Sequence, residues 1–196
     1  QGTALSDDTL KGVRLEPNST NLILNNQTFS GWTASNASVS DNAAVSPFGS
    51  TIAATLNEGV GVSTTHSITY TGITGVSNTN IVTVAVYLKK GAFGADWMRV
   101  GIRLMDGSTI TSVFYNVNTG TVGTKSAAVT QAWVDTDLTN GWYRCVFTCP
   151  AYVTSGVGAS QPQVLINMSN GDGAANLTYT GTGRINNVFG AQLWAR

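Results

Sequence analysis

The chain has 196 residues, of which 42% are hydrophobic and only 10% are charged, and its formal net charge is zero. This length suits one domain with a substantial buried core. A neutral chain has no long-range field to attract nucleic acid or an anionic membrane, and no run of about eighteen apolar residues marks a membrane span. We therefore expect neither partner, and we expect a surface built mainly from neutral polar residues.

Residues 1–13 are polar and lack a hydrophobic period, so we expect a linker or N-terminal extension there and one domain over 14–196. Beyond them, short runs rich in Val, Ile, Thr and aromatic residues are separated by turn dipeptides. No stretch of a dozen residues has a helical period. This pattern predicts an all-β fold, a sandwich or barrel. The turn dipeptides are Ser30-Gly31, Phe48-Gly49, Asp106-Gly107, Thr119-Gly120, Asn140-Gly141 and Asn170-Gly171.

The middle of the chain predicts a hairpin in detail. A strand over 82–89 alternates apolar and mixed residues, and a second strand over 97–104 leads to Asp106-Gly107, a strong two-residue hairpin signal. That turn sets the register between strand 97–104 and the strand that follows the turn. With this register, the two strands agree on which of their faces belongs to the core. The expected pairs are Val100 with Val113, Ile102 with Thr111, Met98 with Tyr115, Arg99 with Phe114 and Trp97 with Asn116.

If strand 82–89 is the next neighbour of strand 97–104, one sheet presents an outward cluster of aromatic and cationic side chains. Such a cluster suits a sugar, because aromatic rings stack on its C–H face while an Arg fork binds paired hydroxyls or a carboxylate. The alternative is ordinary cross-strand packing, or burial under a loop or a subunit. The candidate ligand-binding residues are Tyr87, Lys89, Trp97, Arg99, Arg103, Phe114 and Asn116, with Trp133 as a further candidate.

Several other residues point to structural roles. Trp32 is expected in the core, Arg144 is expected to be a buried anchor for loop carbonyls, and His66 is expected to be a satisfied strand histidine. Trp194 lies near the chain end and is a candidate for exposure. The ten acidic residues form no recognisable carboxylate pair for glycoside hydrolysis, so we assign no catalytic residue.

The two cysteines, Cys145 and Cys149, are four positions apart. On one strand they point to the same face, about 13 Å apart at roughly 3.3 Å per residue, which is too far for a disulfide. We expect two free thiols, at least one of them buried.

Five phrases along the chain together resemble one family, the carbohydrate-binding-module-like β-sandwich domains of phage tail fibres, tailspikes and secreted polysaccharide-degrading enzymes. The resemblance covers roughly Arg14 to Leu193. The phrases are Arg14-Leu15-Glu16-Pro17 with Thr20-Asn21-Leu22-Ile23, Phe29-x-x-Trp32, Ser46-Pro47-Phe48-Gly49, Asn140-Gly141-Trp142-Tyr143-Arg144-Cys145 and Gly190-Ala191-Gln192-Leu193.

This resemblance implies a two-sheet antiparallel jelly-roll sandwich and a non-catalytic module that binds a polysaccharide or cell-surface glycan. It also implies an extracellular or virion location, an upstream catalytic or fibre domain, and in some cases a homo-oligomer. Related sandwiches often carry a structural calcium. The acids here are scattered, however, and two turns, Pro47-Phe48-Gly49 and Tyr179-Thr180-Gly181-Thr182-Gly183, lack the acid that relatives often have. We therefore expect no cofactor and assign no metal site.

Two other classes of function stay open on the sequence. One is a structural or oligomerising virion tail domain that touches no sugar. The other is a polysaccharide lyase or hydrolase built on a jelly roll, with His66, a tyrosine and an arginine as the reacting groups. Binding to a glycan panel would distinguish a binding module from a structural domain. Turnover of a polysaccharide panel would distinguish a lyase or hydrolase from both.

Overall fold

The computed structural model describes residues 20–24, 26–151 and 161–196, so the expected extension over 1–13 lies outside the described residues. The strands form two six-stranded sheets and one small ribbon. The first sheet has the order β1 (Thr33–Ser35), β5 (His66–Tyr70), β12 (Gln163–Ser169), β7 (Trp97–Arg103), β8 (Ile110–Asn116), β9 (Thr121–Lys125). The second has the order β10 (Gln131–Asp135), β11 (Tyr143–Pro150), β6 (Ile81–Lys90), β14 (Ile185–Ala195), β3 (Ala53–Glu58), β2 (Ala37–Ala44). The ribbon pairs β13 (Tyr179–Thr180) with β4 (Ser63–Thr64).

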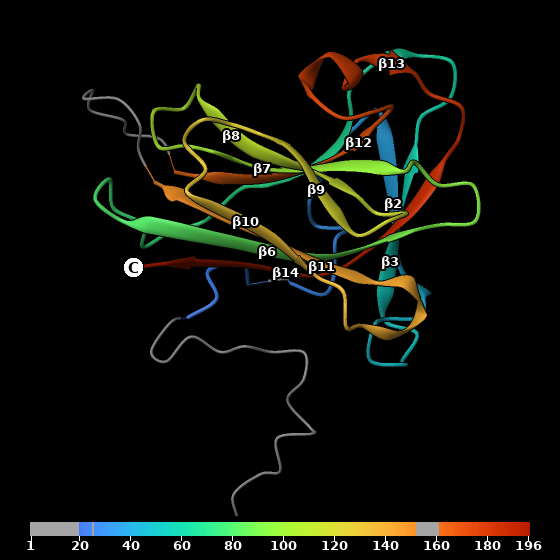
Figure 1. The fold of residues 1–196 in the computed structure, drawn as a ribbon, viewed down its shortest axis with the longest axis horizontal. Helices are drawn as coiled ribbons and strands as arrows, with labels where there is room; N and C mark the ends of the chain where they lie inside the picture. Colours follow the sequence, from blue (N-terminus) through green and yellow to red (C-terminus); the bar gives the residue numbers. More distant parts are fainter. Residues whose placement is uncertain (1–19, 25, 152–160) are drawn as a thin grey trace, which may run out of the picture.

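The strand order is that of a jelly roll. Four central strands of the first sheet, β5-β12-β7-β8, and four of the second, β11-β6-β14-β3, are connected by a chain that crosses repeatedly between the sheets. All pairings between these strands are antiparallel. Figure 1 shows the two sheets stacked, with β7, β8 and β12 above β6, β11 and β14. The predicted fold class, an all-β two-sheet antiparallel jelly-roll sandwich, is confirmed.

Helical structure in the described part of the chain is limited to short 3-10 turns at Thr139–Gly141 and Ala174–Asn176. None of the helices in this part is long and apolar enough to span a membrane. Both observations follow from a sequence in which period-two runs alternate with turn residues.

The core lies between the inner faces of the two sheets. Alternate residues of β6, from Val82 to Leu88, are buried against inward residues of the first sheet such as Met98 and Val100. Each strand contributes every second side chain, which is the physical basis of the period-two pattern. The Tyr115 hydroxyl on β8 donates a hydrogen bond of 2.8 Å to the Val146 carbonyl on β11, and this bond ties the sheets together across the core.

The predicted hairpin is confirmed with its register. All five expected residue pairs between β7 and β8 are present. The turn is held by the Asp106 carboxylate, which accepts hydrogen bonds from the backbone N–H groups of Ser108 and Thr109 at 3.0 and 2.8 Å. Gly107 has φ = 74°, a conformation that favours glycine. The register could be predicted because it is set by this local turn.

The core predictions for Trp32 and the cysteines are also confirmed. Trp32 is buried against Phe29 and Tyr70, with ring centroids 5.0 and 5.3 Å away. Cys145 and Cys149 both lie on β11 and both point into the core as free thiols. Burial raises the pKa of Cys149 to about 12, so both the position and the protonation of this thiol make it unreactive.

The expected pairing of the strand over 82–89 with the strand over 97–104 is wrong. The two strands, β6 and β7, belong to different sheets. Residues 91–96 cross from one sheet to the other instead of forming a hairpin. The crossing is attached to β14: the Gly91 N–H donates to the Ile185 carbonyl at 3.1 Å, and the Asn186 side chain bonds both backbone groups of Ala95 at 2.7 and 2.9 Å. A β-carbon on Gly91 or Gly94 would collide with the Ile185 carbonyl.

Candidate ligand-binding face

The outer face of the first sheet brings together five of the predicted ligand-binding residues, but Phe114 is only 3% exposed, so its prediction as a ligand contact is wrong. β7 lies between β12 and β8, so each outward side chain of β7 has an outward neighbour on both sides. The side chains form four rows across the three strands. In the order β12, β7, β8 these rows are Ser169–Trp97–Asn116, Asn167–Arg99–Phe114, Leu165–Gly101–Ser112 and Gln163–Arg103–Ile110.

Trp97 is half-buried at one end of this face. Its ring lies against Gly123 of β9, where an added β-carbon would be 2.5 Å from the ring carbon Cζ3 and 2.5 Å from a carboxylate oxygen of Asp172. Asp172 in turn accepts hydrogen bonds from the backbone N–H and the hydroxyl of Thr124 at 2.8 and 3.1 Å. The loop that carries Asp172 and strand β9 therefore enclose the tryptophan from two sides, and glycine at 123 is what allows this close contact.

The two arginines of β7 lie in the middle and at the far end of the face. Burial lowers the pKa of Arg99, because removal from water disfavours the charged guanidinium. Arg103 donates a 3.2 Å hydrogen bond to the Gly107 carbonyl. Among the described residues, neither guanidinium forms an ion pair with an acid. The same face of β7 therefore carries two half-buried cations, two rows apart, without a counter-charge in the described part of the chain.

Three polar atoms on this face are buried and have no hydrogen-bond partner in the described part of the chain. They are the Nε atoms of Arg99 and Arg103 and the side-chain oxygen of Asn167. Asn167 itself is only 4% exposed. Buried polar atoms in native proteins are normally satisfied, so these three atoms are exceptions.

A lobe formed by residues 170–184 rises beside this face. Its anchor is Glu58 at the end of β3, whose carboxylate accepts hydrogen bonds from the Tyr179 hydroxyl at 2.7 Å, the Thr182 N–H at 2.7 Å and the Arg184 Nε at 3.1 Å. Burial raises the pKa of Glu58, but these hydrogen bonds outweigh it and hold the pKa at about 2. The guanidinium of Arg184 lies 4.6 Å from the centre of the Tyr179 ring.

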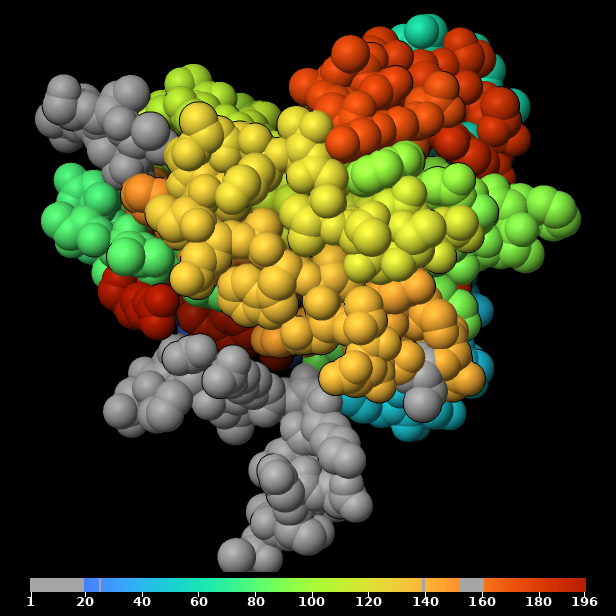
Figure 2. Space-filling model, in the orientation of Figure 1, coloured from blue at the N-terminus to red at the C-terminus, as the bar shows by residue number. Residues whose placement is uncertain are grey.

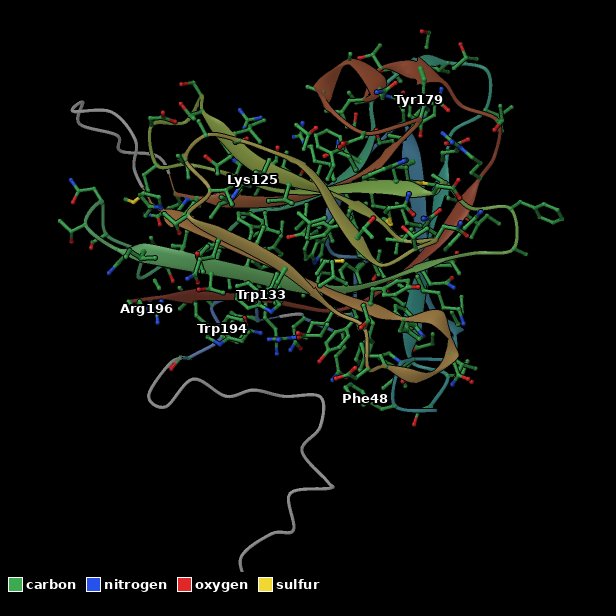
Figure 3. The ribbon with its side chains drawn as sticks, viewed as in Figure 1. Phe48, Lys125, Trp133, Tyr179, Trp194 and Arg196 are labelled. Carbon is green, nitrogen blue, oxygen red and sulfur yellow. The ribbon has the colours of Figure 1, made fainter. Side chains whose placement is uncertain are left out.

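The lobe makes the molecule hollow on this side. Figure 2 shows a notch at the upper edge, between the yellow-green strands and the orange-red lobe. Figure 3 shows Tyr179 within the lobe, on the opposite side of the molecule from Phe48. The outer face of the first sheet therefore lies beside a wall, which a flat exposed sheet would lack.

Two predicted residues do not belong to this face. Tyr87 and Lys89 are on β6 in the second sheet, because the chain crosses between the sheets after Lys90. Tyr87 is buried under the turn at Phe48, whose ring centroid is 5.7 Å away, and it packs beside Phe189 and Trp142. Their proposed closeness to Arg99 and Trp97 is therefore wrong.

Trp133 lies apart from the others, on the outer face of the second sheet, and is 36% exposed. Trp194, a candidate for exposure, is buried against Ala85 and Val146 on the same face. Arg144 is buried as predicted, but its partner is the Asp135 carboxylate at 3.0 Å. Arg144 therefore binds an acidic side chain and not the loop carbonyl groups that the sequence predicted.

His66 is a satisfied structural histidine, as predicted. It is fully buried, with Nδ1 2.7 Å from the Asn36 carbonyl and Nε2 3.3 Å from the Tyr179 carbonyl. In the described residues, no three side chains of His, Cys, Asp or Glu gather as metal ligands do.

Sequence reasoning missed Asn167, Gly123 and Asp172. β12 does alternate apolar and polar residues, so the outward position of Asn167 could have been read from its period. The placement of β12 beside β7, about sixty residues earlier in the chain, has no local signal. The contact between Gly123 and Trp97 depends on the same long-range arrangement.

The chain was compared with families, curated proteins and solved structures. No family model matches it, and no curated protein matches it significantly. One similar solved structure comes from work on the "promiscuous specificity of the carbohydrate-binding modules from the beta-sandwich super family". The two chains are 18% identical with a TM-score of 0.43, and the match covers 90% of this chain. This chain spans 61% of the length of that one.

Proposed function

We propose that this domain is a non-catalytic carbohydrate-binding module whose ligand is an acidic polysaccharide, bound along the outer face of the first sheet. The observation that carries the proposal is the two half-buried guanidinium groups of Arg99 and Arg103 on β7, which form no ion pair with an acid among the described residues. A uronic acid residue supplies the missing anion together with hydroxyl donors and acceptors. The Arg fork matches a carboxylate in two parallel hydrogen bonds.

The shape of the face supports a chain as the ligand. From Trp97 to Arg103 the face extends about 20 Å along β7 at roughly 3.3 Å per residue, which accommodates several sugar units. Trp97 offers an aromatic ring at one end for the C–H face of a sugar. The lobe formed by residues 170–184 limits the ligand on one side, and the hairpin at Asp106-Gly107 lies beyond Arg103 at the other end. The proposed ligand therefore lies along β7.

The biological setting is proposed on the sequence resemblance and the low surface charge. It is a phage tail protein or a secreted polysaccharide-active enzyme, outside the cell or on a virion, where an upstream catalytic or fibre domain accompanies the module. Binding would keep that partner on the polysaccharide. Affinity in the micromolar to millimolar range, about −4 to −8 kcal/mol, suits this task.

The test is affinity electrophoresis and calorimetry on polygalacturonate, alginate and a neutral β-glucan, with the wild type, Trp97→Ala and Trp97→Leu. We expect the wild type to retard on an acidic polymer and both variants to lose at least tenfold in affinity. Phe93→Ala is the matched control, because Phe93 is 81% exposed in the crossing loop and is not one of the residues in the rows of this face.

The proposal fails if the wild type binds no polymer. A structural virion domain would then be the better interpretation. It also fails if both folded Trp97 variants bind as the wild type does. Turnover of the same polymers, measured as new reducing ends or unsaturated products, would instead favour a lyase or hydrolase.

A further inference from the structure

A separate hollow lies on the outer face of the second sheet. Its volume is about 160 Å³, and it is lined mainly by Trp133, Trp194, Arg144, Arg196, Thr83 and Val146. At roughly 30 Å³ per water molecule, it holds about five waters, which is the scale of one sugar ring. Figure 3 shows Trp133, Trp194 and Arg196 together on this side of the molecule, and all three line the same hollow.

The sheet register builds this hollow from small residues between two large ones. Trp133 on β10 pairs with Val146 on β11, Val146 pairs with Ala85 on β6, and Trp194 on β14 pairs with Thr83 on β6. Three strand spacings, about 14 Å, separate the backbones of β10 and β14. The short side chains of β11 and β6 thus form a floor, and the two tryptophans rise from the strands on either side of it.

One arginine side chain that lines this hollow is held in place by a neighbouring carboxylate. The Arg144 side chain is only 9% exposed and is held by Asp135 at 3.0 Å. Since the carboxylate neutralises the guanidinium, the guanidinium attracts a hydroxyl or ether oxygen more than a second anion. Arg196 also lines the hollow, and its charge disfavours a cationic ligand, which two tryptophans would otherwise suit.

We propose that this hollow is a second glycan site, which takes a single neutral sugar ring, such as a chain end or a side branch. The ring would lie against Trp133, with the guanidinium of Arg144 on the lining of the hollow as a hydrogen-bond donor. This site does not depend on the first-sheet face, since the two lie on opposite outer surfaces of the sandwich. A domain with both sites could hold two different polysaccharide strands at once.

The test is a titration of the ¹⁵N-labelled domain with methyl glycosides of glucose, galactose, mannose and N-acetylglucosamine. The indole N–H signals of the five tryptophans are assigned by single Trp→Phe variants. We expect at least one neutral glycoside to shift the Trp133 and Trp194 signals and to leave the Trp97 signal in place, with millimolar affinity. Trp133→Ala should weaken this binding about tenfold or more, and Phe93→Ala should not change it.

Arg144→Lys removes the planar guanidinium but keeps a cation beside Asp135, so it should weaken binding in a domain that remains folded. The outcomes for the two sites are independent: Arg99→Met should weaken acidic-polymer binding at least tenfold and leave these shifts unchanged. The proposal is overturned if no glycoside moves the Trp133 signal at about 50 mM, since millimolar affinity would then be absent. It is equally overturned if folded Trp133→Ala binds as the wild type does.

Discussion

The two outer faces of the sandwich use the same kinds of side chain but differ in what neutralises the arginine. On the first sheet, Arg99 is half-buried beside Asn167 and has no acid among the described residues. On the second sheet, Arg144 is more deeply buried and is held by Asp135. A guanidinium without a counter-charge favours an anionic ligand, and a paired one serves as a neutral hydrogen-bond donor. One fold can therefore present two faces with opposite preferences for ligand charge.

The faces also differ in how they are supported. The first face is bounded by the lobe formed by residues 170–184, which is attached to the sandwich through the Glu58 carboxylate. The hollow on the second sheet is formed entirely by side chains of β6, β10, β11 and β14 and of Arg196, which follows β14. Conditions that loosen the lobe should therefore affect the first face alone.

The largest expected effect is on stability in acid. The folded pKa of Glu58, about 2, is below its ordinary value of 4.5, so the stabilisation is complete above that ordinary value and is lost as the pH falls from about 4.5 to 2. At about 1.4 kcal/mol per pKa unit, the free energy of unfolding should fall by about 3 kcal/mol across this window. Urea unfolding of the wild type and Glu58→Gln, followed by tryptophan fluorescence, measures it.

Glu58→Gln should be less stable by a similar amount at neutral pH and should lack this part of the acid dependence. Equal pH slopes for the two proteins would contradict the assignment. At neutral pH, Glu58→Gln should weaken acidic-polymer binding more than glycoside binding in the second-sheet hollow.

The next effect concerns charge. Arg99→Met keeps the aliphatic stem and removes the guanidinium, so affinity for an acidic polymer at low salt should fall about tenfold to a hundredfold, or about 1.5–3 kcal/mol. Arg196→Met is the matched control, because it removes the same charge from the opposite face. Calorimetry at two salt concentrations checks both. An equal loss in the two variants would show that net charge, and not the first face, controls binding.

The smallest effect tests the support of Trp97. A β-carbon at position 123 would displace the Trp97 ring or the Asp172 carboxylate, so Gly123→Ala should weaken acidic-polymer binding several-fold to about tenfold. Glycoside binding at the second-sheet hollow, measured by the same indole titration, should not change. A Gly123→Ala protein with unaltered polymer affinity would show that the orientation of Trp97 is not important.

The parts of the fold that could be predicted from the sequence depend on local signals. The Asp106-Gly107 turn determines the pairing of Trp97 with Asn116 and of Arg99 with Phe114 through geometry alone. The period-two alternation also identified the core side of β6, whereas for β11 either set of alternate residues could have been the core. These local signals place five candidate residues on one face.

The remaining errors come from contacts between distant parts of the chain. A six-residue loop after Lys90 is compatible with either a hairpin or a crossing, and only Asn186, about ninety residues later, selects the crossing. Tyr87 occupies an outward position, and its burial depends on the turn at Phe48. The pairing of β12 with β7, which brings Asn167 to Arg99, is likewise invisible in a single sequence.

The position of β14 has a consequence for how the domain folds. This strand comes last in the chain but lies in the middle of the second sheet, between β6 and β3. During synthesis, β6 and β3 therefore each keep one edge unpaired until β14 emerges from the ribosome. Because its pairings join residues about a hundred or more positions apart, we expect slow folding dominated by chain closure. A ribosome-bound chain stopped before Ile185 should accordingly be sensitive to proteases and prone to aggregate.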